Sequence, residues 1–227
     1  MAIEYIRMRI GWLYRLRSIY LFATLLLLIV LLPFVGTNLD DVQSRLVGNL
    51  INMLVLVAAV AAVGRSRRSF FVALLFTLPV LGFQFAGLTL GEQRYLVWSW
   101  GFGALFYATT LSLLLRYVFS ADVMNADKLF GAAAAYMLLG ILWAYLYLIL
   151  QYFYTGSFAL QGVPVAAMTP PELVYFSFMV LTTTGFGDIV PVLPHARALV
   201  NLEQICGTLF VAILIARLAG IYPQNEK

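Results

Sequence analysis

Long apolar runs, rather than alternating patterns, dominate this chain. A helix needs about 20 apolar residues to cross roughly 30 Å of hydrocarbon, because each residue adds about 1.5 Å. The windows that qualify are Ile19–Val35, Leu46–Val63, Ser69–Leu88, Tyr95–Leu115, Leu129–Tyr152 and Ala198–Tyr222. The pattern predicts six transmembrane helices.

A seventh apolar run, Pro171–Thr182, is much shorter than the others. Its twelve residues would span about 18 Å as a helix, which is too short to cross a bilayer. We therefore expect a re-entrant helix there. The predicted fold class is an all-α membrane protein with six transmembrane helices and one re-entrant helix.

Composition excludes several other classes of protein. Of the 227 residues, 63% are apolar and only 11% are charged, too few to cover a water-soluble surface. The aromatic content of 15% argues against disorder. The pI near 9.3 does not indicate a nucleic-acid partner, because the basic residues lie between apolar runs. One Cys and one His exclude a disulfide framework and a His-rich metal or catalytic centre.

The basic residues predict the orientation in the bilayer. Eleven fall on the side of the termini: Arg7, Arg9, Arg15, Arg17, Arg65, Arg67, Arg68, Arg116, Lys128, Arg217 and Lys227. Only three fall on the opposite side: Arg45, Arg94 and Arg197. The excess of positive charge is cytoplasmic in membrane proteins. We therefore expect a multi-pass protein of the cell membrane with both termini in the cytoplasm.

The segment Thr183–Asp188, which follows the short helix, carries the most informative chemistry. Gly185 and Gly187 flank one residue, so the backbone there can alternate between conformations that a side chain forbids. Such a backbone can turn successive carbonyl oxygens in one direction. At membrane depth it is tolerated only if protein buries it or if it lines a water-filled path. A ring of carbonyls that replaces the hydration shell of an ion meets that condition.

This segment resembles the selectivity filter of the potassium channel family, and Leu129–Tyr222 resembles that family's pore module. The resemblance implies that the carbonyls of Thr183, Thr184, Gly185 and Phe186, with the Thr183 hydroxyl, bind dehydrated K⁺. Gly187 would complete the backbone, and Asp188 would lie at the outer mouth. Phe186 replaces the Tyr of many members, so a hydroxyl that braces the filter is missing. Four chains would share one filter, which implies a homotetramer.

A second Gly-Phe-Gly, at Gly101–Gly103, tests how specific the motif is. No threonine precedes it, no acid follows it, and it lies within a predicted span. Packing between helices through small residues is the better interpretation of this copy.

The start of the short helix also fits a pore helix at 170–182. Thr169 lies three residues before Glu172, the spacing of a capping box, and proline occupies the first helical position. The negative end of the helix dipole would then point toward the filter and favour a cation.

Two residues of the predicted inner helix, at 196–222, are gating candidates. Gly207 lies 19 residues after Asp188, where the potassium channel family commonly carries a hinge glycine; simple packing is the alternative. Glu203 lies within the span, where an ionisable group indicates function. We favour a hydrogen bond from Glu203 to the back of the pore helix over gating or pH sensing. Met179 stands where some channels of the family place a carboxylate that braces the residue equivalent to Asp188.

The predicted organisation has five parts. Residues 1–18 form a cytoplasmic or interfacial helix, since no small-x-small site follows them as in a signal peptide. Residues 19–119 form a four-helix membrane domain, 120–128 a cytoplasmic linker, 129–222 the pore domain and 223–227 a short cytoplasmic tail. The fourth span, Tyr95–Leu115, lacks the arginine ladder of a voltage sensor.

The sequence therefore predicts a potassium-selective channel with little or no voltage gating. The alternatives are a poorly selective cation channel and a non-conducting subunit or scaffold that modifies another channel. An enzyme is not expected, because Gly-x-Ser-x-Gly, HExxH and paired membrane carboxylates are absent from the sequence. We expect no cofactor, K⁺ as permeant ion, lipid and further copies of the chain as partners, and regulation by the membrane helices or a separate subunit.

Overall fold

The computed structural model describes residues 17–31, 53, 56–57, 59–60, 67–120 and 125–221. Nearly all of the predicted N-terminal helix, most of the second predicted span and the predicted tail lie outside these residues.

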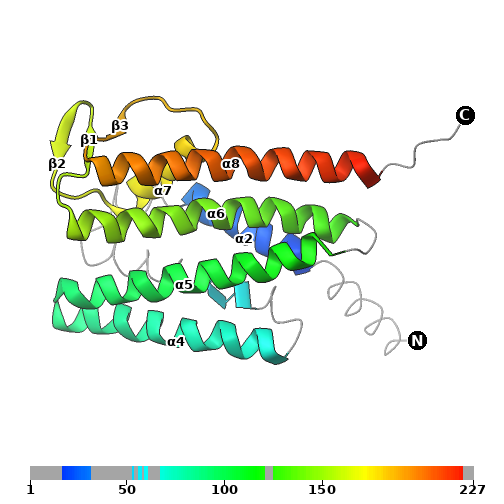
Figure 1. Ribbon diagram of the computed structural model, residues 1–227. Helices are drawn as coiled ribbons and strands as arrows, with labels where there is room; N and C mark the ends of the chain where they lie inside the picture. Colours follow the sequence, from blue (N-terminus) through cyan, green and yellow to red (C-terminus); the bar gives the residue numbers. More distant parts are fainter. Residues whose placement is uncertain are drawn as a thin grey trace, which may run out of the picture.

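Four long helices lie side by side in the order α4, α5, α6 and α8 (Figure 1). Their bounds are Arg67–Leu90 for α4, Gln93–Val118 for α5, Ala126–Phe153 for α6 and Pro194–Ile221 for α8. The shorter α2 (Arg17–Leu31) packs along α6, and α5 packs between α4 and α6. The chain is mostly helical.

Three of the described helices are long and apolar enough to cross a membrane. These segments are Arg94–Val118, Ala126–Phe153 and Pro194–Ala219. Two shorter apolar helical segments, Ser18–Leu31 and Ala73–Gly87, coincide with much of the first and third predicted spans. The six-span layout is thus found in part.

The prediction of an all-α fold is wrong in one detail, because the described residues contain a small sheet. Strands β1 (Phe158–Leu160), β2 (Val163–Val165) and β3 (Ile189–Pro191) pair antiparallel in the order β2-β1-β3. Gln161 and Gly162, both at positive φ (50° and 81°), make the two-residue turn of the β1–β2 hairpin. Three-residue strands are too short to show an alternating pattern, so no periodicity predicted them.

The short helix α7 spans Pro170–Leu181, and it lies with the sheet at the end of the molecule opposite to the C-terminal end of α8 (Figure 1). A buried aromatic cluster holds it against α6 and β1. Tyr147, Phe158 and Phe176 contact one another with ring centroids 5.4–5.5 Å apart. This cluster fixes the position of α7, and therefore of the residues that follow it.

Local signals explain the observed helix bounds. The Asn125 side chain accepts a hydrogen bond from the Lys128 amide at 2.9 Å, so α6 begins at Ala126, inside the predicted 120–128 linker. Helix α8 begins at Pro194, two residues before the predicted inner helix, because proline is favoured in a first turn.

Candidate ion-conducting site

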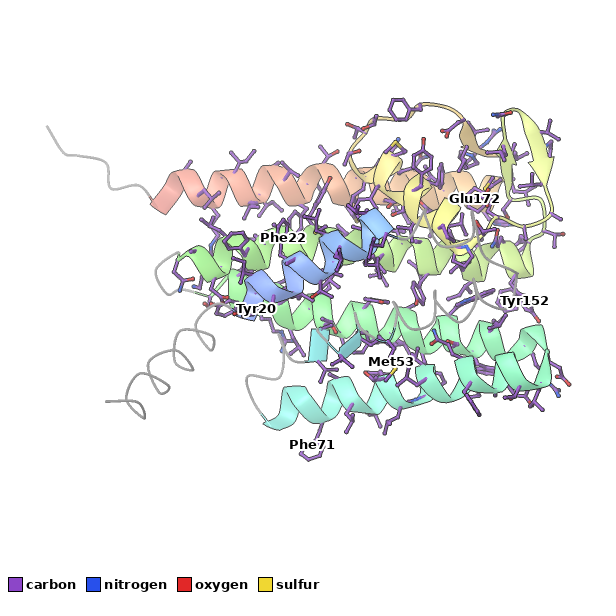
Figure 2. The ribbon with its side chains drawn as sticks, turned by 180° about the vertical axis from the view of Figure 1, so that it is seen from behind. Tyr20, Phe22, Met53, Phe71, Tyr152 and Glu172 are labelled. Carbon is purple, nitrogen blue, oxygen red and sulfur yellow. The ribbon has the colours of Figure 1, made fainter. Side chains whose placement is uncertain are left out.

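The start of α7 is capped by its own side chains. The Glu172 carboxylate accepts hydrogen bonds from the Thr169 amide (2.7 Å) and from the Thr169 hydroxyl (2.8 Å). Figure 2 shows Glu172 at the same end of the molecule as the sheet. Just before the cap, the Gln151 side chain donates to the Met168 carbonyl and accepts from the Met168 amide, both at 2.8 Å. These contacts set where α7 begins.

The C-terminal end of α7 holds the amides of the next residues. The Thr183 amide donates to the Val180 carbonyl at 3.0 Å. The Thr184 and Gly185 amides both donate to the Met179 carbonyl, at 3.0 and 3.2 Å. Carbonyls at a helix end lack intrahelical partners, so this turn satisfies them with the backbone of the segment that follows.

Residues Thr183–Gly187, here named the carbonyl segment, have an alternating backbone. Positive φ occurs at Thr183 (58°), Gly185 (56°) and Gly187 (81°), and not at the two residues between them. Glycine adopts this conformation readily, whereas a β-branched threonine rarely does. The backbone thus alternates in the way that Gly185 and Gly187 were expected to allow.

The carbonyl oxygens of this segment are left without partners in the described part of the chain. None of the five, from Thr183 to Gly187, accepts a hydrogen bond from a described residue. All five residues are exposed, and the Phe186 side chain is 72% exposed. Unpaired carbonyls are costly in a membrane, so five in succession need water, ions or another chain as partners.

The end of the segment is anchored to the sheet. The Asp188 carbonyl accepts from the Gln161 amide at 2.7 Å, and β3 begins at the next residue. On its other side, the Asp188 carboxylate accepts a hydrogen bond from the Tyr175 hydroxyl of α7 at 2.8 Å. This hydrogen bond raises the pKa of the Tyr175 hydroxyl above its ordinary value. The sheet and α7 thus hold both ends of the exposed segment.

Two groups of polar contacts, one helical turn apart and here named the first and second layer, join α7 to α6 and α8. In the first layer, the Ser177 hydroxyl lies 2.5 Å from Glu203 Oε1 and 2.7 Å from the Gly140 carbonyl oxygen. The Tyr147 hydroxyl donates to the other Glu203 oxygen, and the Glu203 side chain is fully buried. Glu203 therefore contacts the back of α7, as the favoured interpretation of the sequence expected.

The second layer lies at the last residue of α7. The Leu181 carbonyl accepts a hydrogen bond from the Tyr136 hydroxyl at 3.0 Å. Gly207 packs against the same carbonyl, and a Cβ added to Gly207 would lie 2.6 Å from that oxygen. Glu203 and Gly207 are four residues apart, as are Ser177 and Leu181, so each pair occupies one face of its helix.

Other predicted residues lie apart from this site. The copy Gly101–Gly103 is helical within α5, where Gly103 packs against Tyr145, so the packing interpretation is confirmed. Cys206 is exposed, because it lies on a face of α8 that no described residue covers.

Sequence reasoning missed several residues of the site, namely Tyr136, Tyr147, Tyr175 and Ser177. The signal for each of them was a polar group within an apolar run, and such a signal does not show which distant residue the group binds.

Comparisons with known proteins bear on the same region. No curated protein and no solved structure matches the chain. Residues 137–222 match the family model described as "Ion channel", and this stretch covers α7, the carbonyl segment and all of α8. The match, together with the apolar helices, supports a membrane protein in a lipid environment. The carbonyl segment thus lies within the part of the chain that is similar to an ion channel domain, and this similarity points to a channel rather than an enzyme.

Proposed function

We propose that this protein is a potassium-selective channel whose carbonyl segment forms the selectivity filter. The observation that supports this most is the run of five exposed carbonyl groups, Thr183–Gly187, on an alternating backbone without partners among the described residues. Carbonyl oxygens that replace the hydration shell let a cation pass without a large dehydration penalty. The permeant K⁺ is the substrate here, and the Thr183 hydroxyl would add one more oxygen at the inner end.

The direction of α7 supports a cation site at the same place. Helix α7 ends at Leu181, two residues before the carbonyl segment, so its negative dipole end lies next to that segment. With twelve residues, α7 is too short to cross a bilayer. In the proposed channel it enters and leaves on the same side, and the sheet and Asp188 form the outer mouth. Both termini would then face the cytoplasm.

The exposed face of α8 supports assembly from several copies. Only 17% of the apolar window of α8 is buried, against 56% for α6. Its exposed apolar residues include Leu202, Ile205, Leu209, Ile213 and Ile215. One chain supplies one run of carbonyls, and enclosing an ion requires a ring of them. A homotetramer in which α8 helices line the centre would cover part of this face.

A poorly selective cation channel is the second candidate, and the environment of Phe186 favours it. The Phe186 ring is 72% exposed and has no hydroxyl that could brace the middle of the filter. A filter that is loosely held would accept ions of different size.

Ion flux into liposomes that contain only the purified protein distinguishes these functions. A potassium-selective channel should pass K⁺ far faster than Na⁺, and native mass measurement should give four copies. Comparable K⁺ and Na⁺ flux would establish the second candidate instead. No flux of either ion from correctly assembled protein would contradict both and favour a non-conducting subunit.

A further inference from the structure

The hydrogen bonds around Glu203 require more protons than the neighbouring hydroxyl groups can donate. Three oxygen pairs lie at hydrogen-bond distance: Tyr147 with Glu203, Ser177 with Glu203, and Ser177 with the Gly140 carbonyl. A hydroxyl has one proton, and a carbonyl or an ionised carboxylate has none. Tyr147 and Ser177 therefore supply two protons for three hydrogen bonds.

A proton on Glu203 resolves this shortage. Glu203 then donates through Oε1 to the Ser177 oxygen, and Ser177 donates its own proton to the Gly140 carbonyl. Glu203 Oε2 is the carbonyl oxygen of the acid and accepts from Tyr147. Every donor is used once and every acceptor is served.

The surroundings of Glu203 independently favour the neutral acid. Glu203 is 0% exposed and lies inside a helix long enough to cross a membrane. Tyr147 and Tyr136, both on α6, are the titratable groups near it, and no described Lys, Arg or His forms an ion pair with it. A buried carboxylate without a cation is costly, whereas a neutral acid with two hydrogen-bond partners is not.

We propose that Glu203 is a neutral carboxylic acid that acts as a positioning residue for the filter, by tying α8 and α6 to the pore helix α7 through Ser177. The hydrogen bonds of Glu203 among the described residues go to Tyr147 and Ser177, and none goes to the carbonyl segment. Glu203 fixes the middle of α7, and the amides of Thr184 and Gly185 donate hydrogen bonds to the Met179 carbonyl of that helix. The effect on selectivity rests on the function proposed above, whereas the protonation state does not.

Two substitutions of similar size distinguish a neutral acid from a carboxylate. In Glu203→Gln the amide nitrogen donates to Ser177 and the amide oxygen accepts from Tyr147, which reproduces the acid. In Glu203→Leu neither contact survives. We expect Glu203→Gln to keep a K⁺ over Na⁺ permeability ratio within about twofold of the parent, and Glu203→Leu to lose roughly tenfold or more, since buried hydroxyl groups lose their partner.

Infrared difference spectroscopy of the protein in lipid at neutral pH detects directly whether the Glu203 side chain carries a proton. The parent should show the carbonyl stretch of a protonated carboxylic acid, and Glu203→Gln should lack it. Tyr147→Phe should move the band to higher frequency, because it removes the hydrogen bond to the acid's carbonyl oxygen. If Glu203→Leu does not assemble, Ser177→Ala serves in its place and should lower thermal stability while keeping a shifted acid band.

The results separate this inference from the proposed function. Absence of an acid band that depends on Glu203, or damage by Gln equal to that by Leu, would overturn the inference even in a conducting channel. An acid band in a protein that passes no ions would uphold the protonation state and contradict only the channel function.

Discussion

The Tyr175 hydroxyl donates a hydrogen bond to Asp188 Oδ2 at 2.8 Å, and so joins α7 directly to the far end of the carbonyl segment. The sequence has Met179 at the position where some potassium channels carry a bracing carboxylate. The structure shows that Asp188 nevertheless has a partner on α7, one helical turn earlier. The segment is therefore held at both ends by the same helix.

Removing this hydroxyl should loosen the proposed filter. In Tyr175→Phe we expect currents to decline roughly two- to fivefold faster during sustained conduction, since a hydrogen bond to a charged group is lost at an exposed site. Single-channel recording in symmetric K⁺ measures this. Tyr152→Phe changes a similarly exposed tyrosine on α6; it is the matched control and should leave the decline unchanged.

Alkaline pH should have the same effect as Tyr175→Phe. Because the hydrogen bond to Asp188 raises the pKa of Tyr175, its contribution is complete below the ordinary tyrosine pKa of about 10 and is lost as the pH rises through the raised value. The difference in thermal stability between parent and Tyr175→Phe, measured from neutral to strongly alkaline pH, should shrink toward zero. A difference that stays constant with pH would contradict the role of the hydroxyl proton.

The two Gly-Phe-Gly copies provide a matched pair of substitutions. A Cβ added to Gly185 or to Gly101 meets nothing within 4 Å, yet only Gly185 has positive φ, at 56°. Gly185→Ala should therefore act through the backbone alone, at about 1–2 kcal/mol per chain, and abolish the preference for K⁺. Gly101→Ala should retain it. Liposome flux of K⁺ and Na⁺ compares them, and equal behaviour of the two variants would exclude the proposed filter.

Gly207 should act as a packing residue. In Gly207→Ala the new methyl group lies 2.6 Å from the Leu181 carbonyl oxygen and 2.9 Å from Leu181 Cδ1, so α7 and α8 must separate. Overpacking of this kind costs about 1–3 kcal/mol, measurable as a lower midpoint in thermal unfolding of the assembly. Gly82→Ala, a helical site in α4 with no atom within 4 Å of the new group, should not be destabilised. Unchanged stability with altered opening would instead favour a hinge at Gly207.

Arg217 should hold the end of α8 to the turn between α5 and α6. Its guanidinium donates to the Phe119 carbonyl at 2.9 Å and to the Ser120 carbonyl at 2.5 Å, and it lies over the Phe119 ring. In Arg217→Ala we expect hydrogen exchange in the last turns of α8 to rise roughly tenfold, because two charge-assisted hydrogen bonds are lost. Arg116→Ala removes the same charge from α5 and should leave that exchange unchanged.

Open probability should depend only shallowly on voltage. Moving one charge through 100 mV is worth about 2.3 kcal/mol, and steep gating requires several such charges in each chain. The arginines of α5 lie only near its ends, Arg94 beside its ion-pair partner Glu92 and Arg116 in the last turn. A conductance–voltage curve in symmetric K⁺ tests this. A steep curve that flattens in Arg94→Gln or Arg116→Gln would show that α5 does move charge.

Several elements could be predicted because their cause is local. A run of about 20 apolar residues is set by the thickness of a bilayer, and this identified the spans that became α5, α6 and α8. The capping box at Thr169 and the length of the apolar run after it identified α7 to within one residue. The three-stranded sheet had no such signal, since strands of three residues form only where segments distant in the sequence meet.

The sequence by itself determined the membrane class and the carbonyl segment, because hydrophobic length and the freedom of glycine are properties of short stretches of chain. Only the tertiary structure decided what holds that segment in place. Tyr147 and Glu203 are 56 residues apart, Tyr136 and Leu181 are 45 apart, and Ser177 and Glu203 are 26 apart. Several tyrosines lie along the apolar α6, and a hydrogen bond between distant residues depends on how three helices pack, so sequence spacing cannot select Tyr136 and Tyr147 from among them.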